Sequence, residues 1–260
     1  MKNTLRLFVA ALISLALIAG CSAYTAQRDT LYQVSVIDAL LAGVYDGDVN
    51  VGTLKKRGDF GLGTFEALDG EMVVLDGEVY RVSSDGNASV APDEVNIPFA
   101  AVAFFKEDFS FESTGDKMDY AALKKLIDSR LVTKNAFYAI KIEGNFGYIK
   151  TRSVFRQKKP YPPLTAALKN QPIFEFENVG GTIVGFRCPD YVTGINVPGY
   201  HFHFLTDDKT AGGHVLEMKT GDINIKIDRI DAFYMNLPRE GGFHGLNFGE
   251  SNSSDLDSVE

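Results

Sequence analysis

Tyr200-His201-Phe202-His203-Phe204-Leu205 is the stretch of sequence that decides the fold around it. Imidazole and aromatic side chains alternate along it, and successive side chains of a β-strand point to opposite faces. A strand would place His201 and His203 on one face and Phe202 and Phe204 on the other, whereas a helix would separate the imidazoles. The alternation therefore predicts a strand with one aromatic face and one face that carries two imidazoles.

A third histidine follows closely. Residues 206–213 are polar and glycine-rich, which predicts a hairpin loop, so His214 returns opposite His201 and His203. Three imidazoles are a ligand set for Zn²⁺ or a similar divalent ion, and three protein ligands leave a position open for water or substrate. This pattern indicates a catalytic metal site. The alternative is a hydrogen-bonded strand pair with an unrelated surface His214. The fourth histidine, His244, is expected in a loop outside the group.

Strand signals continue away from this stretch, and helices are few. Asp76-Gly77 between residues 71–75 and 78–82 predicts a hairpin with a type I′ turn. Residues 136–142 and 146–154 predict a second hairpin around Glu143-Gly144-Asn145. The clearest helices are expected at residues 36–43 and at 120–131, the latter capped by Asp119. A proline-rich stretch at 158–163 is a candidate boundary between an N-terminal and a C-terminal half.

The charge balance limits the partners of the protein. With 26 Lys and Arg against 34 Asp and Glu in 260 residues, the formal charge is −8, which argues against nucleic-acid binding. An anionic substrate would need a local positive charge, which a metal held by neutral imidazoles supplies.

The N-terminus predicts export. Two basic residues precede an apolar run at 7–19, and the small residues before Cys21 resemble a bacterial lipoprotein signal. We expect residues 1–20 to be a signal peptide, Cys21 to be lipidated, residues 21–30 to form a tether, and the protein to be anchored to the cell membrane on its extracytoplasmic side. An ordinary secretory signal or an uncleaved anchor is the alternative. Cys188 would then be the remaining thiol, which excludes an intramolecular disulfide and favours a buried apolar role.

Several motifs occur in the same order as in a known family. Gly58-Asp59-Phe60-Gly61-Leu62-Gly63-Thr64-Phe65, followed by Leu68-Asp69-Gly70-Glu71, resembles the N-terminal signature of bacterial α-acetolactate decarboxylases. Lys150-Thr151-Arg152-Ser153-Val154, Pro198-Gly199-Tyr200-His201 and Gly212-Gly213-His214-Val215 are also similar. The resemblance covers residues 31–260.

The resemblance implies a fold and a reaction. The fold is an α/β protein of the β-rich α+β kind, with two domains built on mixed β-sheets: an N-terminal domain at 31–157, a metal-binding domain at 158–248 whose strands form most of the metal site, and a C-terminal tail at 249–260 that reaches the active site. The reaction is zinc-dependent decarboxylation of 2-acetolactate to acetoin through a metal-stabilised enediolate that is then protonated. A homodimer is also implied.

The resemblance also assigns site residues. His201, His203 and His214 would hold zinc or another divalent metal. Arg152, Glu71 and the C-terminal Glu260 would be catalytic, and Thr64 and Leu68 would lie near the substrate. The proton donor remains unassigned. Spacing alone also admits a cupin-like metal oxygenase or isomerase, and a non-catalytic metal-binding lipoprotein.

Overall fold

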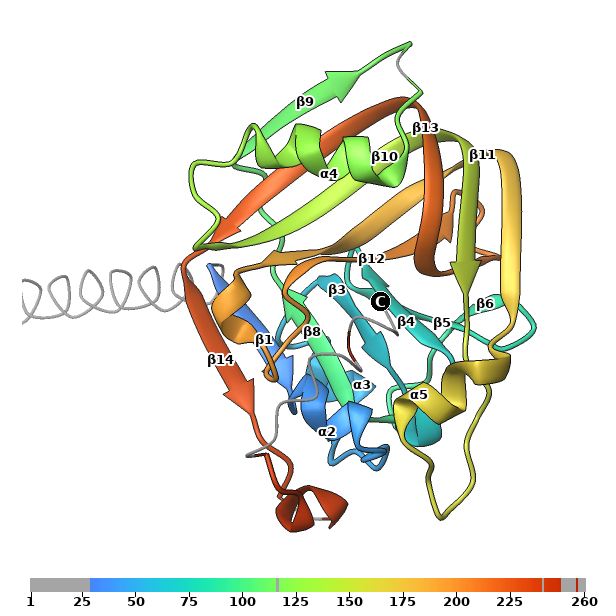
Figure 1. Ribbon diagram of the computed structural model, residues 1–260, viewed down its shortest axis with the longest axis vertical. Helices are drawn as coiled ribbons and strands as arrows, with labels where there is room; N and C mark the ends of the chain where they lie inside the picture. The colour runs from blue at the N-terminus through green and yellow to red at the C-terminus, as the bar shows by residue number, and fades with distance from the viewer. Residues whose placement is uncertain (1–28, 116, 240, 249–255, 257–260) are drawn as a thin grey trace, which may run out of the picture.

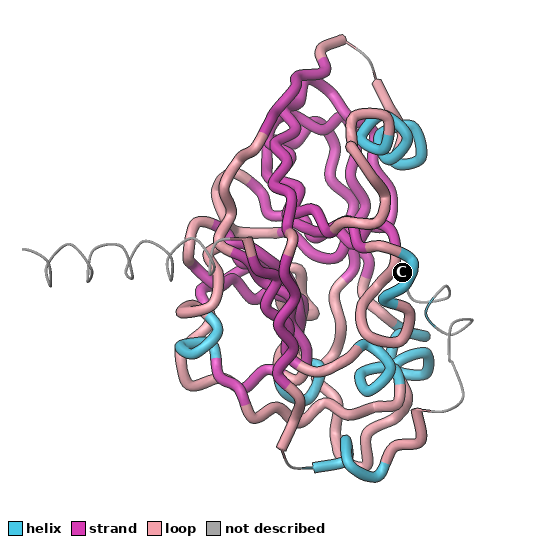
Figure 2. Tube along the Cα trace, turned by 90° about the vertical axis from the view of Figure 1, so that its left-hand side faces the viewer, coloured by secondary structure: helices cyan, strands magenta, loops and turns pink. Residues whose placement is uncertain are grey.

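Two β-sheets lie one above the other along the long axis of the molecule, with the helices at the periphery (Figures 1 and 2). The computed structural model describes residues 29–115, 117–239, 241–248 and 256. The predicted signal peptide, Cys21 and Glu260 lie outside these residues. Strands predominate over short helices, so the β-rich class predicted from the sequence is confirmed.

The first sheet has seven strands in the order β14-β1-β8-β3-β4-β5-β6. It is mixed, because β1 and β14 run parallel while the other neighbours are antiparallel. Asp76 and Gly77 both have positive φ, 52° and 83°, which confirms the predicted turn between β4 and β5. The strands are β1 (Thr30–Val34), β3 (Phe60–Thr64), β4 (Glu71–Leu75), β5 (Glu78–Val82), β6 (Ala88–Val90), β8 (Phe99–Ala103) and β14 (Ala232–Asn236).

The second sheet has five antiparallel strands in the order β10-β11-β12-β13-β9. It closes on itself, since β10 pairs with β13 as well as with β11. The strands are β9 (Phe109–Ser113), β10 (Phe137–Arg152), β11 (Ile173–Cys188), β12 (Gly199–Thr206) and β13 (Gly212–Ile230). A separate pair joins β2 (Val49–Asn50) to β7 (Asn96–Ile97).

The hairpin predicted around Gly144 is wrong. β10 passes through this position as one continuous strand that pairs with β11 on one side and β13 on the other. A Cβ atom at Gly144 would lie 2.2 Å from the Asp222 carbonyl oxygen, so glycine is needed for the close approach of β13, whose register shifts there. Glycine in a bent strand and glycine in a turn look alike in the sequence.

Helices cover only parts of the sheets. They are α2 (Ile37–Leu41), α3 (Val51–Leu54), α4 (Tyr120–Asp128) and α5 (Leu164–Ala167), with 3₁₀ turns at Glu66–Leu68, Leu168–Asn170, Asp190–Val192 and Gly241–Gly245. The predicted cap of α4 is present, because the Asp119 side chain accepts a hydrogen bond from the Ala122 amide at 2.8 Å. Among the described residues, no helix is long and apolar enough to cross a membrane.

One buried core joins the two sheets. Leu62 and Val73 from the first sheet pack in the same cluster as Val184 and Phe186 from the second. Cys188 belongs to this cluster and is 1% exposed, which confirms its apolar role. The two sheets do not correspond to the segments before and after the domain boundary expected between residues 157 and 158. β9 and β10 precede this boundary but belong to the second sheet, and β14 follows it but belongs to the first.

Candidate metal centre

The three predicted imidazoles converge at the junction of the two sheets. His201 and His203 project from β12, and His214, on β13, lies directly opposite His203. Each ring contributes one nitrogen atom to a group of three that all lie within 4.8 Å of one another. The ring centroids are 5.0–5.3 Å apart, which makes a nearly equilateral triangle. The other face of β12 is apolar as expected: Phe202 and Phe204 are fully buried.

Close contact between strands places His214. The residue before it, Gly213, has a φ of 135°, and a Cβ atom there would lie 2.3 Å from the Arg152 carbonyl oxygen. The chain can approach β10 at this point because residue 213 has no side chain. As a result His214 is aligned with both His203 on β12 and Arg152 on β10.

Burial keeps the imidazoles neutral. Loss of solvent lowers the pKa of His203 to about 3 and also lowers the pKa values of His201 and His214. His203 Nδ1 donates a hydrogen bond to the Met72 carbonyl oxygen at 2.7 Å, which fixes the tautomer with a lone pair on Nε2. Neutral imidazoles with exposed lone pairs are the form that binds a transition-metal ion.

A buried carboxylate and a buried guanidinium lie beside the histidines. Glu71 Oε1 is 3.8 Å from Arg152 Nε, and Glu71 Oε2 is 3.7 Å from His203 Nε2. Burial raises the pKa of Glu71 to about 7, although the charge of Arg152 acts in the opposite direction. Both side chains are under 10% exposed. The carboxyl group of Glu71 can thus hold or release a proton near neutral pH.

A pocket connects these groups and has one polar and one apolar side. The polar side consists of the three histidines, Glu71, Arg152 and Thr64, whose hydroxyl donates to the Gly70 carbonyl oxygen at 2.8 Å. The apolar side is formed by seven hydrophobic side chains, of which Leu68 was predicted: Ile37, Leu40, Leu68, Phe99, Val154, Leu164 and Leu168. All seven predicted site residues that lie within the described part of the chain therefore line one pocket.

The C-terminal tail has one described residue. Leu256 is 5% exposed and packs in an apolar cluster with Leu68, Phe99 and Val154, which also line the pocket. Residue 256 thus lies at the outer side of the pocket wall. The role predicted for Glu260 falls outside the described residues. His244 lies away from the metal-ligand group, with a ring nitrogen 2.9 Å from the Arg239 carbonyl oxygen.

Two groups at the site were not found from the sequence. Gln171 Oε1 accepts a hydrogen bond from Arg152 Nη1 at 3.1 Å, and the Met72 carbonyl accepts from His203. A main-chain carbonyl leaves no mark in a sequence, and Gln171 lies in a loop whose position depends on the pairing of β10 with β11. Arg152 lies opposite Ile173 in that pairing, which brings Gln171 near it.

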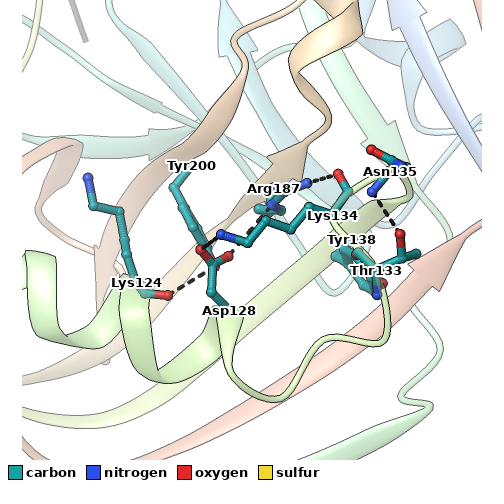
Figure 3. Close-up of polar contacts among 8 residues, drawn as sticks. All are labelled: Lys124, Asp128, Thr133, Lys134, Asn135, Tyr138, Arg187 and Tyr200. Carbon is teal, nitrogen blue, oxygen red and sulfur yellow. Dashed lines mark hydrogen bonds and ion pairs between the residues drawn. The ribbon is translucent and has the colours of Figure 1, made fainter.

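The aromatic face of β12 is attached to α4. The Tyr200 hydroxyl donates to Asp128 Oδ1 at 2.7 Å, and Lys134 Nζ lies 2.7 Å from Asp128 Oδ2 (Figure 3). Arg187, the cross-strand neighbour of Tyr200, is 4% exposed and has Nε 3.8 Å from Asp128 Oδ1. Because Tyr200 and the histidines lie on opposite faces of one strand, this network helps to hold the histidine face in place.

The arrangement fits a catalytic metal centre. Three neutral nitrogen ligands suit zinc or a similar ion and leave at least one coordination position for an oxygen ligand. A guanidinium at the same pocket can bind a carboxylate, and a carboxyl group with a pKa near neutrality can exchange a proton. The apolar side accepts small alkyl groups. Together these features suit a small anionic substrate with oxygen atoms near its carboxylate.

Known proteins resemble this chain over most of its length. A family model described as Alpha-acetolactate decarboxylase matches residues 31–250. A Methanosarcina mazei protein of that name is 50% identical over 234 residues, which are 89% of this chain and 80% of that protein. The crystal structure of alpha-acetolactate decarboxylase from Bacillus subtilis strain 168 has a TM-score of 0.87 and 42% identity, covering 89% of this chain and 99% of that one. The chain therefore belongs to the α-acetolactate decarboxylase family and is an enzyme of the carboxy-lyase class.

Proposed function

We propose that this enzyme converts 2-acetolactate into acetoin and CO₂ at a zinc ion held by His201, His203 and His214. The observation that carries the proposal is the convergence of these imidazoles with Glu71 and Arg152 in one buried pocket of a chain that belongs to this family. The reaction breaks the bond between C1 and C2, releases CO₂ and consumes one proton, so acetolactate and acetoin balance without an oxidant or an organic cofactor.

The chain supplies a site that fits the metal. The described residues contain one group of three histidine, cysteine, aspartate or glutamate side chains able to hold an ion, and it consists of these three histidines. A divalent cation held by these histidines would supply Lewis-acid stabilisation of the negative charge that develops on the oxygens of the substrate. Three nitrogen ligands favour zinc over the hard cations Mg²⁺ and Ca²⁺, which prefer oxygen ligands.

Arg152 binds and orients the anionic substrate. Its guanidinium donates a hydrogen bond to Gln171 and lies 3.8 Å from Glu71, so this buried group is preorganised in the pocket. A contact to the carboxylate alone would stabilise the ground state as much as the transition state. Arg152 accelerates the reaction to the extent that it also stabilises the charge that remains on the substrate after CO₂ leaves.

Glu71 is the described residue best placed to manage the proton. Its carboxyl group lies between Arg152 and His203, 3.8 Å from Arg152 Nε and 3.7 Å from His203 Nε2, where it can pass a proton to a substrate in the pocket. A positioned acid of this kind contributes roughly 10²–10⁴-fold in rate. Glu260 shares this task in our proposal, because Leu256 packs four residues earlier in the chain against the wall of the same pocket.

The cellular setting is part of the proposal and rests on the sequence. The basic N-terminus, the apolar run and Cys21 support a lipoprotein anchored outside the cytoplasm, and family resemblance supports a homodimer. Labelling with a lipid precursor would show incorporation that the Cys21→Ala variant loses, and sedimentation of the protein lacking residues 1–21 would measure the subunit number. A protein that carries no lipid, or that sediments as a monomer, would overturn the corresponding part.

One assay tests the chemistry. The protein is incubated with racemic 2-acetolactate, and CO₂ and acetoin are measured before chelation, after chelation, and after addition of each divalent metal. We expect equal amounts of the two products, loss of both with the chelator and recovery with zinc. Folded, zinc-loaded protein that releases no CO₂ would overturn the proposed function. Consumption of O₂ instead would indicate a metal oxygenase.

A further inference from the structure

The turn between β3 and β4 forms part of the pocket wall and has an unusual backbone. Ala67 and Leu68 both lie in the left-handed region, with φ of 63° and 56°. This region is strained for a residue that carries a Cβ atom, so two such residues in succession persist only where other contacts hold them. Both are almost fully buried, and Leu68 lines the pocket.

Main-chain hydrogen bonds hold the start of this turn. The Ala67 amide donates to the Tyr45 carbonyl oxygen at 2.8 Å, and the Ala67 carbonyl accepts from the Gln157 amide at 2.7 Å. Gln157 belongs to the segment that leaves β10 after Arg152. The turn that precedes Glu71 is therefore attached to the chain that follows Arg152.

Two ion pairs, from Arg81 and Arg156 to the Asp69 carboxylate, form a clasp that holds the end of the turn. Asp69 Oδ2 accepts from Arg156 Nη1 at 3.0 Å and from Arg81 Nη1 at 3.1 Å. Arg81 lies on β5 of the same sheet, whereas Arg156 lies on the segment that follows β10 of the other sheet. One carboxylate thus joins the first sheet to the segment that follows β10, next to Leu68 of the pocket wall.

The clasp is close in the sequence to both groups of the buried ion pair. Asp69 is two residues before Glu71, Arg156 is four residues after Arg152, and the Glu71–Arg152 separation is 3.8 Å. We propose that Asp69 is a positioning residue for the reaction: by bridging Arg81 and Arg156 it fixes Leu68 and Glu71 relative to Arg152. This inference rests on the proposed decarboxylation.

A positioning role of the clasp can be distinguished from a contribution to folding stability, because the two effects differ in size. The Asp69 side chain is 28% exposed and that of Arg156 is 61% exposed, and ion pairs this exposed contribute little to folding stability. A displacement of about 1 Å at a reacting group, by contrast, can reduce a rate by about 10²-fold. Loss of the clasp should therefore leave the fold almost unchanged and affect turnover.

The test compares Asp69→Asn with a matched control, Asp76→Asn. Asp76 lies at the other end of β4 and pairs with Lys141 of β10 at 3.3 Å, so it also bridges the two sheets, but away from the pocket. Asparagine is tolerated in its type I′ turn. Zinc content, melting temperature, kcat and KM for acetolactate are measured for the full chain and both variants.

We expect Asp69→Asn to lower kcat by on the order of 10-fold to 10²-fold with KM changed less than about 3-fold, while zinc content and melting temperature match Asp76→Asn. Arg156→Gln should reproduce the loss, and Arg156→Lys should restore most of the activity because it keeps the ion pair. Equal kcat in Asp69→Asn and Asp76→Asn, or a loss that zinc depletion fully explains, would overturn the inference. A wild-type protein that releases no CO₂ would instead overturn the proposed function together with this role.

Discussion

His203 on β12 donates a hydrogen bond through Nδ1 to the Met72 carbonyl oxygen on β4 at 2.7 Å. This bond joins the second sheet to the first at the metal site. It also assigns Nε2, which has no hydrogen-bond partner among the described residues, as the atom free to bind a metal ion. The hydrogen bond of His203 thus holds β12, which carries two of the candidate metal ligands, against β4, which carries Glu71.

Replacement of His203 should remove the metal and the activity together. His203→Ala deletes one of three ligands and the bond to Met72, so we expect zinc content to fall from one ion per chain to near zero and acetoin formation to fall at least 10²-fold. His244→Ala is the control, because His244 is exposed and outside the ligand group. Full turnover in metal-free His203→Ala would refute the ligand assignment.

Gln171→Ala should weaken substrate handling without loss of metal. It removes the acceptor for Arg152 Nη1, so we expect kcat/KM to fall by about 10-fold or more, in line with roughly 1.5–3 kcal/mol for a hydrogen bond to a charged group. Gln171→Glu keeps an acceptor oxygen and should retain more activity. Steady-state kinetics with a zinc assay checks this, and unchanged kinetics in Gln171→Ala would show that Arg152 is oriented by other contacts.

Gly213→Ala should destabilise the protein and its metal site. The new Cβ atom would lie 2.3 Å from the Arg152 carbonyl oxygen, so β13 must move and carry His214 with it. Gly77→Ala is the control for backbone strain alone, since Gly77 also has positive φ but a Cβ atom there meets nothing within 4 Å. We expect urea unfolding to show a larger loss for Gly213→Ala by about 2 kcal/mol or more, and zinc titration to show weaker binding. Equal losses would contradict the close-approach argument.

Asp228 should make folding stability depend on pH. Its side chain is 1% exposed, accepts a hydrogen bond from the Lys106 amide, and burial, with Asp108 and Asp29 nearby, raises its pKa from 3.8 to about 7. Folding therefore favours the protonated form. The destabilisation is absent below about pH 4, grows as the pH rises from about 4 to about 7, and is constant above that.

Asp228→Asn removes this dependence and keeps an acceptor for Lys106. We expect the variant to be more stable than the wild type at pH 8, by roughly 1–3 kcal/mol, and nearly equal to it below about pH 4. Urea unfolding at the two pH values measures the difference. A difference that does not change with pH would show that Asp228 is ionised in the folded protein throughout this range.

Local patterns predicted much of the fold correctly. The alternation at His201–Phe204, the Asp76-Gly77 turn and the Asp119 cap each depend on residues close together in the chain. The mistaken hairpin at Gly144 shows where such reasoning stops, because the close approach that requires this glycine comes from β13, far along the chain.

The sequence by itself determined that His201 and His203 share a face, and it predicted that His214 returns to them to complete a candidate metal site. It gave no local reason to join Glu71 and Arg152 to that site; only family resemblance did. The tertiary structure decided that they meet there, along with the bonds to Met72 and Gln171 and the clasp at Asp69. Glu71 and Arg152 lie on different sheets. The short distance between them, and the burial that raises the pKa of Glu71, arise because long-range strand pairing closes the pocket.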